Sequence, residues 1–248
     1  MELIQLAKGV YAIDTCTYIP EEKLLVVADI HLGFEEYLRK QGVLVPKFHL
    51  KDCIEKLDWI LKRVVIKKVV LNGDVKHEFG TISQQEWKDT RKLIHFFEEK
   101  KIKIVVVKGN HDIIFHPLAE KHALEEVKEL RISNFLIIHG DKIPENLAPI
   151  VIMGHEHPAI TLRERGKAEK FKCFLVYTYK NSSIIVQPSF NPLTQGTDIT
   201  KELLFNQFLQ GRNCQVYFVN DKTHEVLPFG TLAHLKNLSY PDIISFRG

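Results

Sequence analysis

Five short apolar runs in this 248-residue chain each end in a cluster of Asp, Asn and His, and this repetition constrains the fold more than any other feature. The runs are residues 24–28, 69–71, 102–107, 135–138 and 150–153. They are nearly continuous rather than alternating, which predicts strands that are covered on both faces.

Helical patterns lie between the early runs. Residues 50–64 place apolar side chains such as Leu57 and Ile60 on one face, and Ser83 with Glu86 three residues later forms a capping-box pattern. Strands that alternate with helices in this way indicate βαβ units and a buried sheet.

The pattern changes after Pro158. Strands are expected at residues 160–163, 171–179, 183–186 and 215–219, with turn residues Arg165-Gly166, Asn181-Ser182 and Asn220-Asp221 between them. This half is expected to be mostly antiparallel. No Pro/Gly/Ser-rich linker separates the halves, so we expect one α/β domain over residues 1–248.

Composition narrows the class of protein. The net charge is +3, from 34 Lys and Arg against 31 Asp and Glu, which neither demands nor excludes a nucleic-acid partner. No signal-peptide core opens the chain and no stretch approaches 18 apolar residues, so no membrane association is expected. The four cysteines form no Cys-x-x-Cys pair and are expected to be buried free thiols in a reducing cytoplasm: Cys16, Cys53, Cys173 and Cys214.

The polar clusters carry the chemistry. Sites in open α/β sheets form outside the carboxyl ends of the strands, so we expect five such clusters to converge. Each cluster alone is more commonly a turn, but their recurrence after buried strands favours one metal site. Carboxylate, amide and imidazole ligands suit Mn, Fe or Zn better than Ca. The candidate ligands are Asp29, His31, Asp74, Asn110, His139, His155 and His157.

In order, the segments Asp29-x-His31, Gly73-Asp74, Gly109-Asn110-His111-Asp112, His139 and Gly154-His155-x-His157 resemble the signature of the calcineurin-like metallophosphoesterase superfamily. The resemblance implies a four-layer α/β/β/α sandwich with mixed sheets flanked by helices. It also implies two divalent metal ions, with Mn²⁺ expected and Fe, Zn or Ni as alternatives. One ion would be held by Asp29, His31, Asp74 and His157, and the other by Asp74, Asn110, His139 and His155.

The same resemblance implies the reaction. A metal-bound hydroxide would attack phosphorus in line with the leaving oxygen. His111 would stabilise the transition state or protonate the leaving group, and Asp112 would orient and charge His111. His77 lies three residues after Asp74, where the double-strand-break repair nucleases carry a histidine that contacts the substrate phosphate. The alternative for His77 is a supporting residue hydrogen-bonded to a neighbour.

A narrower likeness is carried by residues 28–36, 73–80 and 188–192, with Gly42 and Pro46. These segments are similar to those of small phosphoesterases found beside a DNA ligase in bacterial repair clusters, and of their archaeal relatives. That group implies a manganese-dependent phosphodiesterase acting on short nucleic acid or a nucleotide, in DNA repair.

Three other functions are alternatives to a phosphodiesterase. A phosphomonoesterase acting on small phosphorylated metabolites is the second enzyme hypothesis. A binding scaffold on the same fold is disfavoured because His111 and Asp112 are both present. A phosphoprotein phosphatase is disfavoured because no arginine follows Asp74 closely.

Several properties are not encoded in any motif: the natural substrate, the metal used, endo- or exonuclease action and the oligomeric state. Residues 190–200 are expected to be either a substrate loop or a plain connection. Arg39 and Lys76 are expected to be either phosphate contacts or surface charges.

Overall fold

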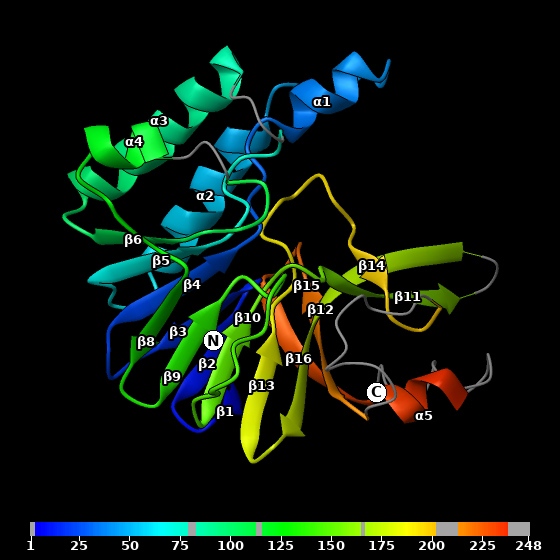
Figure 1. Ribbon diagram of the computed structural model, residues 1–248. Coiled ribbons are helices and arrows are strands. Elements are labelled where there is room, and N and C mark those ends of the chain that lie inside the picture. The colour runs from blue at the N-terminus through cyan, green and yellow to red at the C-terminus, as the bar shows by residue number, and fades with distance from the viewer. Residues whose placement is uncertain (1–2, 79–82, 113–115, 165–166, 202–212, 238–248) are drawn as a thin grey trace.

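The computed structural model describes residues 3–78, 83–112, 116–164, 167–201 and 213–237. It contains two β-sheets that pack face to face (Figure 1). The first sheet has the strand order β1-β2-β3-β4-β5-β6-β7. Its strands are β1 (Ile4–Ala7), β2 (Val10–Ile13), β3 (Cys16–Ile19), β4 (Leu24–Ala28), β5 (Lys68–Asn72), β6 (Lys103–Val107) and β7 (Glu125–Val127).

The second sheet has the order β14-β11-β12-β13-β10-β9-β8, with β15 paired to β12 and β16 paired to β15. Its strands are β8 (Glu129–Ile132), β9 (Phe135–Ile138), β10 (Ile150–Met153), β11 (Pro158–Glu164), β12 (Lys167–Tyr179), β13 (Ser182–Val186), β14 (Thr197–Asp198), β15 (Gln215–Asn220) and β16 (Glu225–Thr231). As predicted, most pairs after residue 158 are antiparallel, although β10 runs parallel to both β9 and β13, and β11 to β14.

Helices flank the sheets. Figure 1 shows α1 (Phe34–Lys40), α2 (His49–Leu61), α3 (Gln84–Glu99) and α4 (His116–Lys121) on the side of the first sheet that faces away from the second. The predicted capping box is present: the Ser83 hydroxyl accepts from the Glu86 amide, and the Glu86 carboxylate accepts from the Ser83 amide. On the other side of the molecule, α5 (Leu232–Asn237) packs against the second sheet through Leu232.

The apolar core is divided into the layers that this arrangement creates. Alternate residues of β4 show the division, because Leu25 and Val27 pack toward the helices while Leu24 and Val26 pack toward the second sheet. A third cluster covers the outer face of the second sheet. Burying one such side chain contributes about 1.5–3 kcal/mol. The strands are therefore covered on both faces, and the mixed α/β fold with two sheets flanked by helices is confirmed.

The structure also extends the prediction. The strands β1, β2 and β3, which form one edge of the first sheet, carry no clear sequence signal, and neither do the short helices α1, α4 and α5. The expected turn at Arg165-Gly166 lies outside the described residues. All four cysteines are buried and free. Among the described residues, no helix has both the length and the apolarity needed to cross a membrane.

Candidate metal centre

The carboxyl ends of the central strands meet at one edge of the molecule. In the first sheet β4, β5 and β6 are parallel and in register, so Ala28 lies beside Asn72 and Asn72 beside Val107. In the second sheet β9 and β10 are also parallel, with Ile138 beside Met153. Each predicted cluster begins immediately or within three residues after one of these strands, which brings the clusters together as expected.

The backbone at this edge is strained. Five of the seven candidate ligands have positive φ angles: Asp29 (55°), His31 (49°), Asp74 (47°), His155 (70°) and His157 (46°). Asp, Asn and His tolerate this left-handed conformation better than other non-glycine residues, but it still costs on the order of 1 kcal/mol each. The strands turn sharply where they end, and the turn directs these side chains toward the same volume.

Glycines make room for the ligands. A Cβ atom on Gly109 would overlap the carboxylate of Asp74, and one on Gly154 would overlap the carboxylate of Asp29. Neither φ angle requires glycine, so the requirement is one of space. The Gly-Asn-His-Asp and Gly-His-x-His motifs therefore begin with glycine because a carboxylate from another strand lies against that backbone.

One group of candidate ligands combines Asp29, His31 and His157, whose ligand atoms all lie within 4.8 Å of one another. His31 Nε2 and His157 Nε2 are 3.4 Å apart, and His157 Nε2 is 3.5 Å from Asp29 Oδ1. These three residues are the ones that the family resemblance assigns, together with Asp74, to the first ion.

A second group combines Asp74, His139 and His155 in the same way. His139 Nε2 lies 3.4 Å from Asp74 Oδ2, 3.0 Å from His155 Nδ1 and 2.9 Å from Asn110 Oδ1. The structure thus brings together all four residues that the resemblance assigns to the second ion.

Asp74 lies between the two groups. Its Oδ2 atom is 3.4 Å from His139 Nε2 of the second group and 3.7 Å from His31 Nε2 of the first. Its other oxygen accepts a hydrogen bond from the His111 amide at 2.9 Å. This placement suits a carboxylate that bridges two cations.

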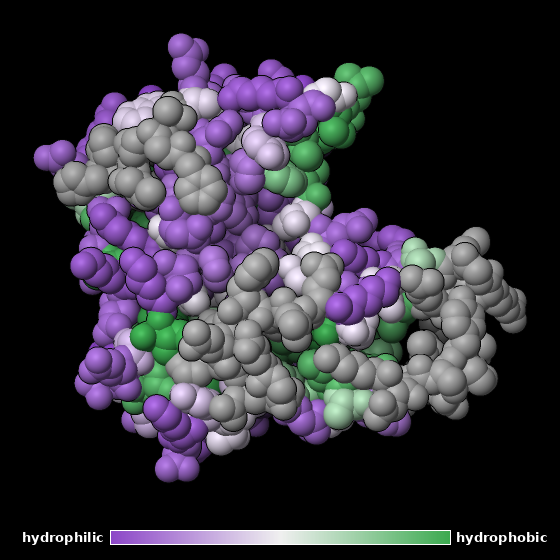
Figure 2. Space-filling model, turned by 45° about the vertical axis from the view of Figure 1, so that its right-hand side comes forward, coloured by the Kyte–Doolittle hydropathy of each residue, from purple (hydrophilic) through white to green (hydrophobic). Residues whose placement is uncertain are grey.

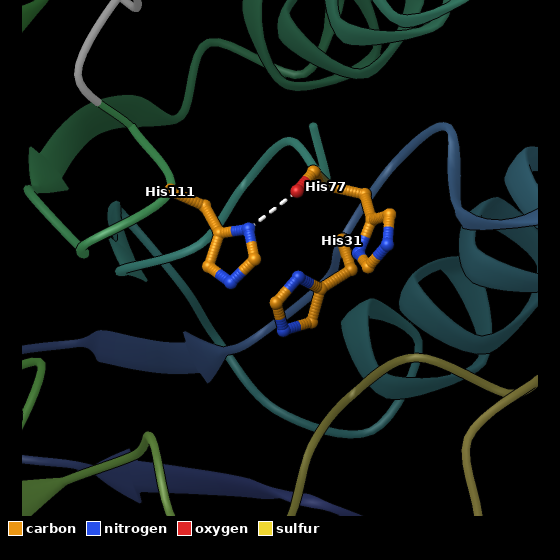
Figure 3. Close-up of side chains that lie close together, drawn as sticks. All are labelled: His31, His77 and His111. Carbon is orange, nitrogen blue, oxygen red and sulfur yellow. Dashed lines mark hydrogen bonds between the residues drawn. The ribbon is translucent and has the colours of Figure 1, made fainter. Parts of the chain in front are cut away.

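His111 and His77 lie beside the first group. Figure 3 shows the rings of His31, His77 and His111 gathered from the loops that follow β4, β5 and β6, with ring centroids 5.0–5.6 Å apart. The Nδ1 atom of His111 is in hydrogen-bond contact with the His77 carbonyl, and its Nε2 atom lies 3.8 Å from Asp74 Oδ2. The ring of His111 is thus oriented with one nitrogen toward the candidate ligands.

Asp112 occupies a different place from the one expected. Its Oδ1 accepts hydrogen bonds from the amides of Val75 and Lys76, and its Oδ2 accepts one from the Gly109 amide. The carboxylate therefore ties the loop after β5 to the loop after β6. The Nδ1 atom of His111 contacts the backbone carbonyl of His77, whereas the family resemblance implies that Asp112 orients this ring.

Burial and neighbouring charges shift the pKa values of the residues in the site. Burial alone would raise the pKa of Asp29, but His157 and His139 outweigh it and hold that pKa below its usual value. Burial would lower the pKa of His139, yet Asp74 and Asp29 raise it to about 9. Burial and the nearby His157 lower the pKa of His31 to about 3. Burial, followed by the Asp74 charge, raises the pKa of Asp112 to about 6.

The polar atoms of the site fit a cation. Asp29 Oδ1, which lies 3.5 Å from His157 Nε2, is buried and has no hydrogen-bond partner among the described residues. Buried polar atoms normally have partners, so such exceptions need a cause. Facing imidazole nitrogens, as in His31 with His157 and His139 with His155, repel unless a proton or a cation lies between them. The mixed oxygen and nitrogen donors match transition metals.

A segment after β13 supports the site from behind. The Ser189 hydroxyl donates to the Asp29 carbonyl at 2.7 Å, and the Phe190 amide donates to the Ala28 carbonyl at 2.8 Å. Lys172, buried in β12, donates to the carbonyls of Ser189 and Asn191 at 2.7 and 2.5 Å. No pattern around Lys172 in the sequence signals this role.

The structure shows the contacts of Lys76 and Arg39, the two basic residues considered as phosphate contacts or surface charges. Lys76 is 1% exposed and donates to the Glu78 carbonyl, so the expectation of a surface charge is wrong for this residue. Arg39 donates to Gln85 Oε1 at 2.9 Å.

The segment 190–200 is joined to the first group of ligands near its far end. There the Thr197 amide donates a hydrogen bond to the His157 carbonyl at 2.8 Å.

Comparisons with known proteins agree with this geometry. The family model described as calcineurin-like phosphoesterase matches residues 22–218. No curated protein matches the chain. Among solved structures, a nuclease MPE from Pseudomonas putida is 20% identical, covers 92% of this chain and 99% of its own, and has a TM-score of 0.66.

Two other structural matches are more distant. A predicted phosphoesterase from Streptococcus pneumoniae is 16% identical over 84% of this chain and 94% of its own, with a TM-score of 0.39. A Vps29 mutant from Entamoeba histolytica is 17% identical over 84% of this chain and 99% of its own, with a TM-score of 0.32. At these identities, the likeness to the nuclease is one of fold alone.

Proposed function

Because the chain belongs to the calcineurin-like phosphoesterase family, we propose that it is a phosphodiesterase that uses two divalent metal ions, with Mn²⁺ as the expected ion. The observation that carries the proposal is the position of Asp74. A single carboxylate oxygen of this residue lies within 4 Å of ring nitrogens from both groups of ligands.

Each ion would have a separate set of ligands. Asp29, His31 and His157 would hold the first, and Asn110, His139 and His155 the second, with Asp74 shared. Two such ions lower the pKa of a bound water and neutralise the charge of a transferring phosphoryl group. The unpaired, buried Oδ1 atom of Asp29 supports this assignment.

His111 is the candidate acid. The His77 carbonyl oxygen orients the ring, because Nδ1 must carry a proton to donate a hydrogen bond to it. The Nε2 atom, which lies 3.8 Å from Asp74 Oδ2, would carry the proton that is given to the leaving oxygen. Asp112 is a positioning residue in this proposal, since it fixes the loops that carry Asp74 and His111.

Diesters are proposed over monoesters, with short nucleic acid or a nucleotide ester as the natural substrate and DNA repair as the setting. Support comes from the segments shared with the ligase-associated group and from the nuclease whose fold the chain resembles. His77 is our candidate for contact with the substrate, and this is supported by the position of its ring beside the rings of His31 and His111.

The first experiment compares hydrolysis of bis-p-nitrophenyl phosphate and p-nitrophenyl phosphate by the purified protein. Mn²⁺, Fe²⁺, Zn²⁺ and Ni²⁺ are added separately after treatment with a chelator. We expect faster cleavage of the diester, loss of activity in chelator and recovery with Mn²⁺. A strong preference for the monoester would replace the proposal with a phosphomonoesterase acting on small metabolites.

A variant separates catalysis from binding. His111→Ala should reduce turnover while leaving metal content, measured by elemental analysis, unchanged. A His111→Ala protein with full turnover would remove the assigned acid. Wild-type protein that binds two ions but cleaves neither ester would favour a binding scaffold.

A further inference from the structure

A chain of aromatic rings leads from the candidate metal centre to the protein surface. His77 contacts His31 and His111 on one side, with ring centroids 5.4 and 5.6 Å apart. On its other side it contacts Phe34 and Tyr37 of α1, each with its ring centroid 4.7 Å away. Tyr37 is therefore one ring removed from the candidate ligand His31.

The outer end of this chain is exposed. Tyr37 is 37% exposed, and the segment that follows α1 carries Val43, Leu44 and Phe48 with exposures of 48%, 98% and 56%. These are four of the six large apolar residues that are exposed in the described part of the chain. Figure 2 shows hydrophobic atoms projecting at the upper right, beside a hollowed hydrophilic surface. Apolar surface gathered beside a polar site indicates a place where a ligand binds.

The helix that carries these rings is held in place. The buried carboxylate of Glu35 accepts a hydrogen bond from the His49 amide of α2 at 3.2 Å, and another from Gln85 of α3. A phenyl ring in α1 also supports the tyrosine, because Phe34 and Tyr37 are stacked with an interplanar angle of 16°. The exposed ring is thus pre-organised, which reduces the entropy lost when a ligand stacks on it.

The basic side chains of α1 already form contacts with neighbouring residues of the protein. Arg39 donates to Gln85, and Lys40 lies 3.2 Å from Glu78 and 3.8 Å from Glu36. These contacts leave the aromatic face, rather than a positive charge, as the distinctive feature next to the site.

We propose that Phe34, Tyr37 and His77 form a stacking subsite for the nucleobase attached to the phosphodiester that is cleaved. The proposal rests on the phosphodiesterase function proposed above and names the group that the enzyme recognises. The near-parallel rings of Phe34 and Tyr37 suit a flat ligand, and stacking of bases on aromatic side chains is tolerant of sequence. The enzyme would accordingly accept any base beside the scissile phosphate.

The test uses diesters that differ only in the group to be recognised. Thymidine 5′-(p-nitrophenyl phosphate), its 3′ isomer, methyl p-nitrophenyl phosphate and octyl p-nitrophenyl phosphate share one leaving group. The ratio of kcat/KM for each thymidine ester to that for the methyl ester measures the contribution of the nucleoside. Wild-type protein, Tyr37→Ala, Tyr37→Phe and Leu44→Ser are compared with Mn²⁺, and circular dichroism checks that each variant is folded.

We expect Tyr37→Ala to lower this ratio about tenfold for at least one thymidine isomer, the size of one lost stacking contact. Hydrolysis of the methyl ester by each variant serves as the reference for this ratio. Tyr37→Phe should keep the ratio, because the ring remains, and Leu44→Ser, a matched change on the same exposed surface, should keep it too.

Each contrary result has its own meaning. A ratio that Tyr37→Ala leaves unchanged, in a protein that cleaves the methyl ester, overturns the stacking subsite alone. A wild-type preference for the octyl ester over both thymidine esters overturns it in favour of an alkyl chain. Absence of cleavage of every diester, with monoester cleavage intact, overturns the phosphodiesterase function instead.

Discussion

Asp14 and Asp29 make an instructive pair. Both carboxylates are fully buried, and both residues have positive φ angles, 51° and 55°. Asp14 lies 2.6 Å from Lys56 Nζ and 2.5 Å from His224 Nδ1, and it also accepts a hydrogen bond from the Thr15 amide. Every strong interaction that the Asp14 carboxylate needs is supplied by the protein.

Asp29 is only partly satisfied. Its Oδ2 accepts a hydrogen bond from the His155 amide at 2.9 Å, while its Oδ1 faces imidazole nitrogens at 3.5 Å without a hydrogen bond from the described residues. Burial and backbone strain are thus shared by a structural carboxylate and a candidate ligand. What distinguishes the ligand is the oxygen that the protein leaves available.

The largest expected effect comes from substitution of Asp14, the carboxylate with a structural role. Asp14→Asn should lower the free energy of unfolding by about 3–5 kcal/mol, because the largely buried Lys56 then keeps only its longer ion pair, with Asp221 at 3.7 Å. Urea denaturation followed by circular dichroism measures it. Asp58→Asn, which removes two solvent-exposed ion pairs, with Lys62 and Lys100, is the control and should show a much smaller loss. An equally small loss for Asp14→Asn would show that its ion pair is not structural.

The same substitution at Asp29 should reduce catalytic activity rather than stability. Asp29→Asn should reduce diester hydrolysis by more than about 100-fold, since even the outer partners of metal ligands cost 10–100-fold. Its loss of unfolding free energy in chelator should be much smaller than that of Asp14→Asn. Steady-state kinetics with Mn²⁺ and urea denaturation test the two parts. A stability loss equal to that of Asp14→Asn would erase the distinction.

Metal binding should separate the two variants directly. At a Mn²⁺ concentration 100 times the Kd, we expect the wild type to gain about 2.7 kcal/mol of stability. Asp14→Asn should show the same gain and Asp29→Asn little of it. Thermal unfolding with and without Mn²⁺ provides the measurement, and a full gain in Asp29→Asn would exclude that residue from the metal site.

The smallest effect is a pH dependence. Burial would raise the pKa of Asp14, but Lys56 and His224 outweigh it and hold it well below its usual value. The stabilisation is therefore complete above the unfolded-state pKa near 3.9 and is lost as the pH falls below it. The stability gap between wild type and Asp14→Asn should narrow by roughly 1 kcal/mol at pH 3. Denaturation curves at pH 7, 5 and 3 would reveal a constant gap if the carboxylate were not ionised.

The strands that position the site could be predicted because their signal is local. The runs 24–28, 135–138 and 150–153 coincide with β4, β9 and β10, since continuous apolar residues followed by polar clusters mark a buried strand and its end. The three strands before residue 20 have only four residues each, too few for a periodic pattern to stand out.

The contacts within the site could not be predicted from the sequence, because they depend on tertiary structure. The sequence placed Asp112 next to His111 in the chain, but the carboxylate turns to the amides of Val75 and Lys76, more than 30 residues away. The burial of Lys76 and Lys172 could not be predicted either. Each ammonium group donates hydrogen bonds to backbone carbonyls that come near it only in the folded protein.

The two groups of candidate ligands draw on both sheets, and this has a consequence for how the protein acquires activity. Asp29, His31 and Asp74 follow strands of the first sheet, while His139, His155 and His157 follow strands of the second. Neither half can assemble a complete cation site before the sheets have docked. During refolding, metal uptake should therefore lag behind the formation of secondary structure and coincide with the final assembly of the chain.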